Sequence, residues 1–362
     1  MLYRVIGLMS GSSLDGLDIA FTEIQENAGN WSYEILEADC YPYPKPWSVR
    51  LKEATQLTAR EYLLLHTEYG HYLGQQVNRF IEQYALHYKV ALVSSHGHTT
   101  FHLPARGMTA QLGDGSAIAA ETRLPVVSDL RSIDLAFGGQ GAPIVPVGER
   151  LLLNEYDYFL NLGGIANISF NRDRYIAFDV CPANRVLNML AMDAGMEYDD
   201  KGQLASNGTI NEGLLKMLND LEYYQQPFPK SLANDFGTDV IYPLIKTQVI
   251  TTENALRTYI AHIVLQIRNS LRGIEEAGQP KKMLVTGGGA FNDFLVNELK
   301  SALASMNVEV VIPSERLVSY KEAMIMGLIG VLRWRQDYNV FSSVTGSTRD
   351  SIGGALWTGE EA

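Results

Sequence analysis

The chain has 362 residues, which is enough for two domains of ordinary size. Its formal net charge of −12, from 41 acidic and 29 basic residues, argues against a nucleic-acid or anionic-membrane partner, because such partners require a basic surface. Cys40 and Cys181 are the only cysteines, which indicates neither a disulfide framework nor a metal cluster. The N-terminus lacks a signal-peptide pattern, and no run of about 18 apolar residues occurs, so we expect a cytoplasmic protein.

The first half of the chain begins with three strand-like segments, which lie at 3–9, 17–24 and 31–40. Short turns separate them, which favours an antiparallel meander. A helix is predicted over 61–84, where the expected apolar stripe consists of Leu63, Leu64, Tyr69 and Leu73. Two further strands are predicted at 90–94 and 125–129.

The second half repeats this order of elements. A second meander is predicted from strands at 158–162, 166–170 and 175–180. A longer helical insert follows over roughly 185–280, and it includes a periodic apolar helix at 252–271. The remaining elements are strands at 283–286 and 308–312 and a helix at 322–334. A meander followed by alternating helices and strands is typical of a ribonuclease-H-like unit, so the sequence predicts two such units.

Glycine-rich segments follow the first strand of each half and the strand at 283–286. Glycine lets the backbone approach a ligand, consecutive N–H groups bind anions, and Asp15 or Asp18 could support Mg²⁺. A plain hairpin turn is the alternative for the first segment, and structural packing is the alternative for the third. The candidate nucleotide-binding residues are Gly11, Ser12, Ser13, Leu14, Asp15, Gly16, Leu17, Asp18, Gly163, Gly164, Gly287, Gly288, Gly289 and Asn292.

The candidate general base is Asp179, which lies where the third strand of the second meander ends. A carboxylate in this position can accept a proton from water or a sugar hydroxyl. The alternative is that Asp179 caps the following helix. A second polar cluster contains His96, His98 and His102. Zinc is one interpretation of this cluster, but loop or substrate-facing histidines are favoured because no cysteine or carboxylate lies at a supporting spacing.

Seven motifs follow one another along nearly the whole chain: MSGSSLDGLD, SSHGHT, SDLRSIDLAFGGQGAPIVP, NLGGIANISF, TGGGAFND, YKEAMIMGLIG and SVTGSTR. In this order they resemble the motifs of anhydro-N-acetylmuramic acid kinases. The resemblance implies an α/β protein with two ribonuclease-H-like domains, the actin-like ATPase or sugar kinase fold, around a central cleft. The expected first domain comprises 1–136 with about 339–362, and the second comprises 137–338 with the helical insert.

The resemblance also implies an activity and roles for individual residues. The expected enzyme uses ATP and Mg²⁺ to hydrolyse 1,6-anhydro-N-acetylmuramic acid, or a related anhydro amino sugar, and to phosphorylate its 6-oxygen in cell-wall sugar recycling. Asp179 would activate the water, Asp15 would support the metal, and Glu322 would contact the sugar. The other residues in substrate-facing segments are His98, Thr99, Arg131 and Gln140.

Arg131 could form a bidentate pair with the lactyl carboxylate of a muramic acid. An exposed structural ion pair is the competing interpretation. The expected partner is a small-molecule sugar, and a second copy of the chain in a homodimer is a further candidate.

The segment after Asp179 departs from the family pattern Asp-Thr-Gly-Pro-Gly-Asn. Cys181 and Ala183 replace its two glycines, so they would be strained if the backbone required positive φ. We expect their side chains to narrow or reshape the sugar pocket. The alternative function is a catalytically inactive nucleotide-binding sensor or scaffold on the same fold.

Overall fold

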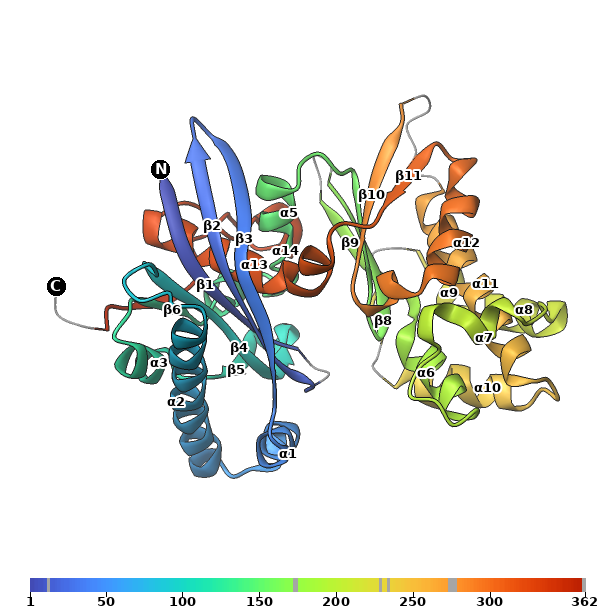
Figure 1. The fold of residues 1–362 in the computed structure, drawn as a ribbon, viewed down its shortest axis with the longest axis horizontal. Coiled ribbons are helices and arrows are strands. Elements are labelled where there is room, and N and C mark those ends of the chain that lie inside the picture. Colours follow the sequence, from blue (N-terminus) through green and yellow to red (C-terminus); the bar gives the residue numbers. More distant parts are fainter. Residues whose placement is uncertain (12–13, 172–174, 228–229, 233–234, 273–278, 360–362) are drawn as a thin grey trace. The chain divides into compact units, whose positions relative to one another are not determined.

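The computed structural model describes residues 1–11, 14–171, 175–227, 230–232, 235–272 and 279–359. The chain divides into two compact units (Figure 1). Unit 1 comprises Met1–Asn154 and Tyr320–Ala362, and unit 2 comprises Glu155–Ser319.

Unit 1 is built on a seven-stranded sheet in which β5 pairs with β4 beside the path β12-β6-β4-β1-β2-β3. The first three strands form an antiparallel meander, β4 is parallel to β1, and β6 is parallel to β4. The strands are β1 (Leu2–Ser10), β2 (Gly16–Asn27), β3 (Asn30–Pro42), β4 (Leu92–Leu103), β5 (Met108–Leu112), β6 (Val126–Ser128) and β12 (Ala355–Trp357).

Unit 2 is built on a five-stranded sheet with the order β11-β10-β7-β8-β9. Its strands are β7 (Tyr158–Leu162), β8 (Ile165–Phe170), β9 (Ile176–Pro182), β10 (Lys281–Thr286) and β11 (Val308–Val311). An antiparallel meander again precedes two parallel strands, so β6-β4-β1-β2-β3 of unit 1 has the same arrangement as the unit 2 sheet. The predicted repetition of a ribonuclease-H-like unit is thereby confirmed.

The helices of unit 1 are α1 (Lys45–Glu53), α2 (Ala59–Gln83), α3 (Gly115–Thr122), α4 (Ser132–Ala136), α5 (Pro146–Leu152), most of α13 (Glu315–Arg335) and α14 (Ser342–Thr345).

A capping box between Thr58 and Glu61 starts α2. The apolar stripe predicted for α2 is partly wrong: Leu63 and Leu64 are 63% and 53% exposed. The buried face runs instead through Leu65, Tyr69 and Leu73, which follow one another at the four-residue spacing of a single helix face.

The helices of unit 2 are α6 (Asn184–Met192), α7 (Gln203–Ser206), α8 (Glu212–Asn219), α9 (Glu222–Gln225), α10 (Tyr242–Lys246), α11 (Thr252–Leu271) and α12 (Asp293–Ala304). Short helical turns in the two units are η1 (Ala54–Gln56), η2 (Pro104–Arg106), η3 (Asp200–Gly202), η4 (Phe236–Ile241) and η5 (Gly288–Phe291). No helix within the described ranges is both long and apolar enough to cross a membrane.

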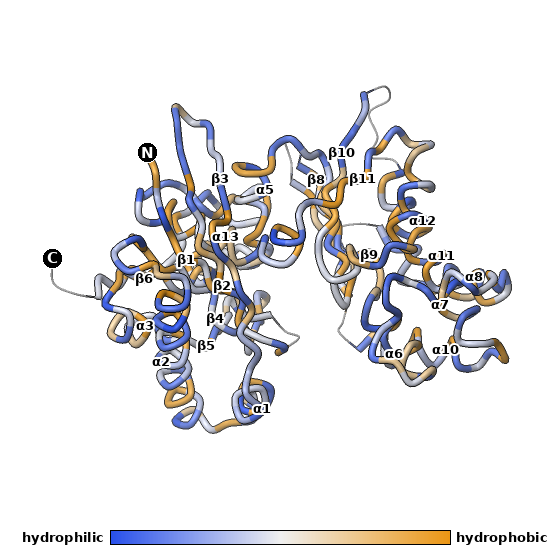
Figure 2. The backbone as a smooth tube through the Cα atoms, in the orientation of Figure 1, coloured by the Kyte–Doolittle hydropathy of each residue, from blue (hydrophilic) through white to orange (hydrophobic). Residues whose placement is uncertain are grey.

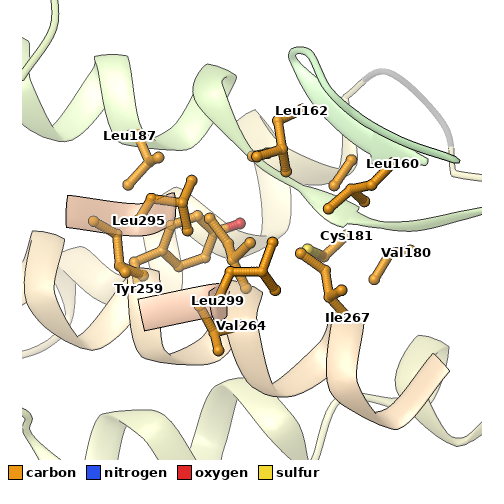
Figure 3. Packing of buried hydrophobic residues seen from close by; sticks show 14 of the residues in the cluster. Leu160, Leu162, Val180, Cys181, Leu187, Tyr259, Val264, Ile267, Leu295 and Leu299 are labelled. Carbon is orange, nitrogen blue, oxygen red and sulfur yellow. The ribbon is translucent and has the colours of Figure 1, made fainter. Parts of the chain in front are cut away.

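Each unit has its own apolar core. In unit 2 the strands and the helices α6, α11 and α12 contribute to one buried cluster, part of which is seen in Figure 3. In unit 1 the cluster joins the meander to α2. Figure 2 shows hydrophobic colour along the inner part of β10, after its hydrophilic start, and hydrophilic colour at the tip of the β2–β3 hairpin. Burial of one face of each element is therefore the main source of stability in both units.

The unit boundaries differ from those expected from the sequence. Segments 137–154 and 320–338, expected in the second domain, belong to unit 1. For 320–338 the reason is the contact between α13 and the unit 1 sheet, because a Cβ at Gly7 of β1 would lie 1.8 Å from the Ala323 carbonyl oxygen. Segment 137–154 is joined to α13 by the ion pair between Glu149 and Lys321. The C-terminal segment returns to unit 1 as expected, since β12 pairs with β6.

Strand β4 is much longer than the predicted segment 90–94. It continues to Leu103 because β5 pairs with its second half, from His98 opposite Leu112 to Leu103 opposite Met108. The histidines at 96, 98 and 102 therefore lie on a strand and not in a loop. Both β5 and β12 were missed: β12 has only three residues, whereas β5 alternates apolar and polar residues and could have been recognised.

We predict that Gly7→Ala strongly destabilises the protein. The added methyl group would overlap the backbone of α13 at Ala323 and Gly327, so helix and strand would have to separate. Overpacking of this kind costs about 1–3 kcal/mol or more. Urea unfolding measures the loss, and Gly213→Ala on α8 is the control, since its Cβ would only approach Asn211 Oδ1 at 3.3 Å. Equal stabilities of the two variants would contradict the tight α13–β1 contact.

Candidate functional site

Arg131 follows β6 at the start of α4, and its side chain is partly buried. It is the arginine among the predicted substrate-binding residues. Its Nε donates to His96 Nε2 at 2.9 Å, and its Nη1 donates to the Gly141 carbonyl at 2.7 Å. Burial lowers the pKa of Arg131 to about 10, and the charge of Glu322 opposes this shift. At neutral pH the guanidinium is still charged, and the alternative of an exposed structural ion pair is wrong.

His96 is held as a neutral ring. Burial, with the neighbouring Arg131 charge, lowers its pKa to about 3. Its Nδ1 contacts the Gly97 carbonyl oxygen at 2.9 Å. An arginine can only donate hydrogen bonds, so Nε2 must be the unprotonated nitrogen and Nδ1 carries the proton.

The loop that presents Gly141 and Gln140 is anchored by a buried carboxylate. Asp134 is 1% exposed, and its Oδ2 accepts from the Gly141 backbone at 2.6 Å. Its Oδ1 accepts from Thr345 Oγ1 at 2.6 Å, while the Gln140 amide donates to the Thr345 carbonyl at 2.9 Å. The Gln140 side chain is left exposed on a loop whose backbone is fixed. Asp134 was not recognised from the sequence, and His96 was noted there only as part of the histidine cluster, without its contact to Arg131.

Glu322 and Asp18 are close enough that the negative charge of Glu322 raises the pKa of Asp18. Burial raises the pKa of Glu322, with Lys321 and Arg131 opposing the shift. Burial also raises the pKa of Asp18 to about 6, a hydrogen bond from the Cys40 thiol opposes this, and the charges of Asp15 and Glu322 add to it. The carboxylates of unit 1 that were predicted to contact metal and sugar thus form one negative region.

The first glycine-rich hairpin lies between β1 and β2. Leu14 has φ +59°, and its amide donates to the Gly11 carbonyl at 3.4 Å, while the exposed Asp15 accepts from the Gly16 amide at 3.1 Å. Ser12 and Ser13 lie outside the described residues. Leu17 is 1% exposed in the unit 1 core, so its predicted nucleotide contact cannot involve its side chain.

His98 lies at the end of a chain of buried hydroxyl groups. Its Nδ1 is 3.1 Å from Ser10 Oγ, which accepts from the Tyr43 hydroxyl at 2.8 Å. Burial lowers the pKa of His98, so its ring is neutral at pH 7. Thr99 is exposed and accepts from Gln111 Nε2 at 3.3 Å. In the part of the chain that the structure describes, no three His, Cys, Asp or Glu residues form a metal-binding group.

Unit 1 contains a polar cavity of about 290 Å³. His96 forms part of its wall, but none of the five predicted substrate-binding residues does. Carboxylates, hydroxyl groups, imidazoles and an indole line it, from Asp114, Asp129, Ser128, His66 and Trp357 among others. Arg131 does not line this cavity, which is linked to the Arg131 anchor only through the His96 ring.

Asp179, the predicted general base, lies on β9 in unit 2. Its Oδ2 accepts from the Leu232 amide at 2.9 Å and from Ser231 Oγ at 3.2 Å. Helix α6 has no side-chain cap, so the alternative that Asp179 caps it is wrong. Burial raises the pKa of Asp179, and these two hydrogen bonds oppose the shift. The contact of Ser231 and Leu232 with Asp179 was not predicted from the sequence, since more than fifty residues separate them from Asp179.

The strand that carries Asp179 is irregular immediately after it. Asp179 pairs with Asn167, and Cys181 pairs with Ala166, so Val180 is an extra residue on β9. A bulge of this kind changes the direction in which neighbouring side chains point. Here it lets Val180 and Cys181 both enter the core, while Asp179 stays partly accessible.

The expectation that Cys181 and Ala183 narrow the sugar pocket is wrong. Both are 0% exposed and belong to the apolar cluster of unit 2, where Figure 3 places Cys181 near Ile267. Neither residue has positive φ, and Ala183 has φ −125°. Replacement of the family glycines therefore adds core packing and causes no left-handed strain.

The glycine-rich segments of unit 2 meet at the ends of β7 and β10. The Gly163 and Gly164 carbonyls accept from the Asn184 and Ala183 amides at 3.0 and 2.8 Å. Gly287 has φ +83°, and a Cβ there would lie 2.4 Å from Asn161 Oδ1. Gly288 is exposed, and a Cβ on it would meet only Asn184 Nδ2, at 3.4 Å.

Asn292 has a structural contact in addition to its predicted role. It caps α12, because its Oδ1 accepts from the Leu295 amide at 3.0 Å. Its side-chain oxygen is thus engaged within the protein, and the exposed or partly exposed glycines of this region are Gly163, Gly164, Gly287 and Gly288.

Comparison with known proteins gives a family match along almost the whole chain. The family model of anhydro-N-acetylmuramic acid kinase matches residues 3–359. The chain is 32% identical over 367 residues to the anhydro-N-acetylmuramic acid kinase of Gloeobacter violaceus, covering 95% of this chain and 96% of the relative. It is 34% identical over 328 residues to the enzyme of the same name from Rhodopseudomonas palustris, covering 85% and 86%.

Among solved structures, the activator of the 2-hydroxyisocaproyl-CoA dehydratase from Clostridium difficile with bound ADPNP is similar, with a TM-score of 0.46 and 13% identity over 92% of this chain and 96% of that one. The sequence matches lead to a plain assignment: the chain belongs to the anhydro-N-acetylmuramic acid kinase family.

Proposed function

We propose that this protein hydrolyses 1,6-anhydro-N-acetylmuramic acid, or a closely related anhydro amino sugar, and phosphorylates its 6-oxygen with ATP. Its family membership makes it a sugar kinase of cell-wall sugar recycling. The observation that carries the proposal is the partly buried Asp179 carboxylate, held through one oxygen by two donors. Its two cysteines are free thiols, which suits the reducing cytoplasm where we place the enzyme.

Asp179 is suited to act as the general base. Oδ2 is oriented by Ser231 and Leu232, so Oδ1 is the oxygen that would accept a proton from water. That water attacks the anomeric carbon, the bond from this carbon to the 6-oxygen breaks, and the 6-oxygen takes the γ-phosphoryl group of ATP. ADP leaves, and Asp179 holds the proton lost by the water. The raised pKa of Asp179 brings its basicity closer to that required at neutral pH.

The sugar would be held by residues of unit 1. Arg131 has a charged guanidinium that is anchored by neutral groups, which suits it to bind the lactyl carboxylate. Glu322 and Gln140 would contact sugar hydroxyl or amide groups, as would His98 and Thr99. The fixed backbone of the Gln140 loop would limit the conformational entropy lost when the sugar binds.

In unit 2, the backbone that would contact a nucleotide is chiefly that of Gly288, Gly163 and Gly164. In unit 1, the candidates among the described residues of the first hairpin are Gly11, Leu14 and Asp15. The mutual repulsion of Asp15, Asp18 and Glu322 fits a divalent cation, since a bound cation would relieve it. Asp15 and Asp18 would hold Mg²⁺, directly or through water. The ion would supply charge neutralisation at the phosphates.

We predict that Asp179→Asn abolishes most turnover but preserves nucleotide binding. The amide has the shape of the carboxylate without its basicity, so kcat should fall by roughly 10²–10⁴-fold. ADP release with and without 1,6-anhydro-N-acetylmuramic acid measures the loss, and ATP affinity measured by calorimetry is the control. A wild-type protein that turns over no sugar would instead favour the inactive sensor or scaffold.

We predict that the KM for Mg–ATP rises as the pH falls through about 6. Asp18 becomes protonated near this pH and loses the negative charge that would support Mg²⁺. In Asp18→Asn the KM should be high at every pH, because that charge is absent throughout. Steady-state kinetics from pH 5 to 8 provide the measurement, and a wild-type KM independent of pH would argue against a role for Asp18 in metal binding.

We predict that Gly288→Val weakens ATP binding by about tenfold or more without unfolding the protein. The new side chain would project from an exposed position near Asn184, where nucleotide is expected. Gly289→Val is the contrasting variant, since its Cβ would lie 2.7 Å from Leu162 Cβ and should lower the melting temperature. Unchanged ATP affinity in a folded Gly288→Val protein would remove this site from the proposal.

A further inference from the structure

Among the residues that the structure describes, Arg131 is a charged group whose hydrogen-bond partners are neutral. Its two hydrogen bonds go to an imidazole nitrogen and a backbone carbonyl. Within the described residues, no carboxylate forms an ion pair with it, and Glu322 acts on it only through space. A cation removed from water without a counter-ion is costly, so a ligand anion would be favoured at this position.

The contacts of His96 leave it no direct role with a ligand. Nε2 accepts from Arg131, and Nδ1 donates to the Gly97 carbonyl. Both ring nitrogens are therefore occupied, and the side chain is only 3% exposed. His96 has no remaining hydrogen-bonding atom with which to contact a sugar or transfer a proton, so any effect of this ring on the reaction must pass through Arg131.

We propose that His96 is a positioning residue that gives the enzyme its preference for acidic sugars. The neutral ring fixes the plane of the Arg131 guanidinium, so that its remaining N–H groups are ready for a substrate carboxylate. This inference rests on the proposed function, because it concerns the acid-bearing sugar that Arg131 would bind there.

The choice of a neutral partner has a physical reason. A carboxylate at position 96 would orient Arg131 equally well, but it would also neutralise the guanidinium and compete with the substrate carboxylate. An imidazole that accepts one hydrogen bond orients the cation and leaves its charge available. The Gly141 carbonyl, fixed by Asp134, provides the second neutral anchor. Two anchors on different segments hold the planar guanidinium in one orientation.

The test compares two sugars and two variants. 1,6-Anhydro-N-acetylmuramic acid carries the lactyl carboxylate, and 1,6-anhydro-N-acetylglucosamine lacks it. His96→Leu fills a similar volume without an acceptor, whereas His96→Gln can still accept from Arg131 Nε. For the acid we expect His96→Leu to raise KM by roughly 10–100-fold, the value of one hydrogen bond to a charged group. We expect a smaller change in kcat and recovery of most of the KM in His96→Gln.

The sugar without the carboxylate is the internal control. Its KM should be unchanged in both variants, because it does not use Arg131. Equal losses for both sugars in His96→Leu would mean that the ring has a general structural role, and this would overturn the inference. An unchanged KM for the acid would overturn it as well. Far-UV circular dichroism and melting temperatures confirm that the variants compared are folded.

Calorimetry without ATP separates this inference from the proposed function. If the wild type turns over neither sugar, the proposed kinase activity on these substrates fails. The inference still stands if the wild type binds the acid more tightly than the neutral sugar and His96→Leu removes that difference. A wild type that binds both sugars equally, or neither, would overturn it.

Discussion

Helix α13 lies so close to β1 that only glycine fits between them, and the charged region of unit 1 depends on this contact. Gly7 faces the backbone at Ala323, and Gly330 faces Ser94 of β4. Because α13 is in backbone contact with the sheet, Glu322 is within electrostatic reach of Asp18 and Arg131. A helix displaced by one larger side chain would separate these charges and weaken their coupling.

Lys321, the neighbour of Glu322, forms a buried ion pair with Glu149 of α5, with 3.0 Å between Nζ and Oε1. Burial is the main reason why the pKa of Glu322 is raised; the charges of Lys321 and Arg131 oppose this shift, and the charge of Glu149 adds to it. The ion pair ties α13 to α5 next to Glu322.

In unit 2 the apolar core positions the strand that carries Asp179. The bulge at Val180 turns β9 so that Cys181 enters the apolar core two residues after Asp179. Core residues on both sides hold the strand rigidly, and the segment at Ser231 and Leu232 orients the carboxylate. A carboxylate fixed in this way would lose little entropy when substrate arrives, which suits the general-base role that we propose for Asp179.

Local patterns in the sequence were sufficient for the elements whose burial follows a simple period. The strand at 158–162 and the helix at 252–271 have the predicted bounds, because alternation and helical spacing both reflect a buried face. The repeated order of strands, the ribonuclease-H-like class and the glycine-rich segments were likewise predictable. The motifs, read together, also indicated the family.

Only the tertiary structure decided where polar side chains find their partners. The second half of β4 has no apolar alternation, and it becomes a strand through its pairing with β5. The contacts of Arg131 with His96 and of Asp179 with Ser231 join residues 35 and 52 positions apart. Cys181 and Ala183 were expected at a pocket, but a bulge directs Cys181 into the core and Ala183 is buried with it. Periodicity records which face of an element is buried, whereas hydrogen bonds between distant segments depend on how those segments pack, and no local pattern contains that information.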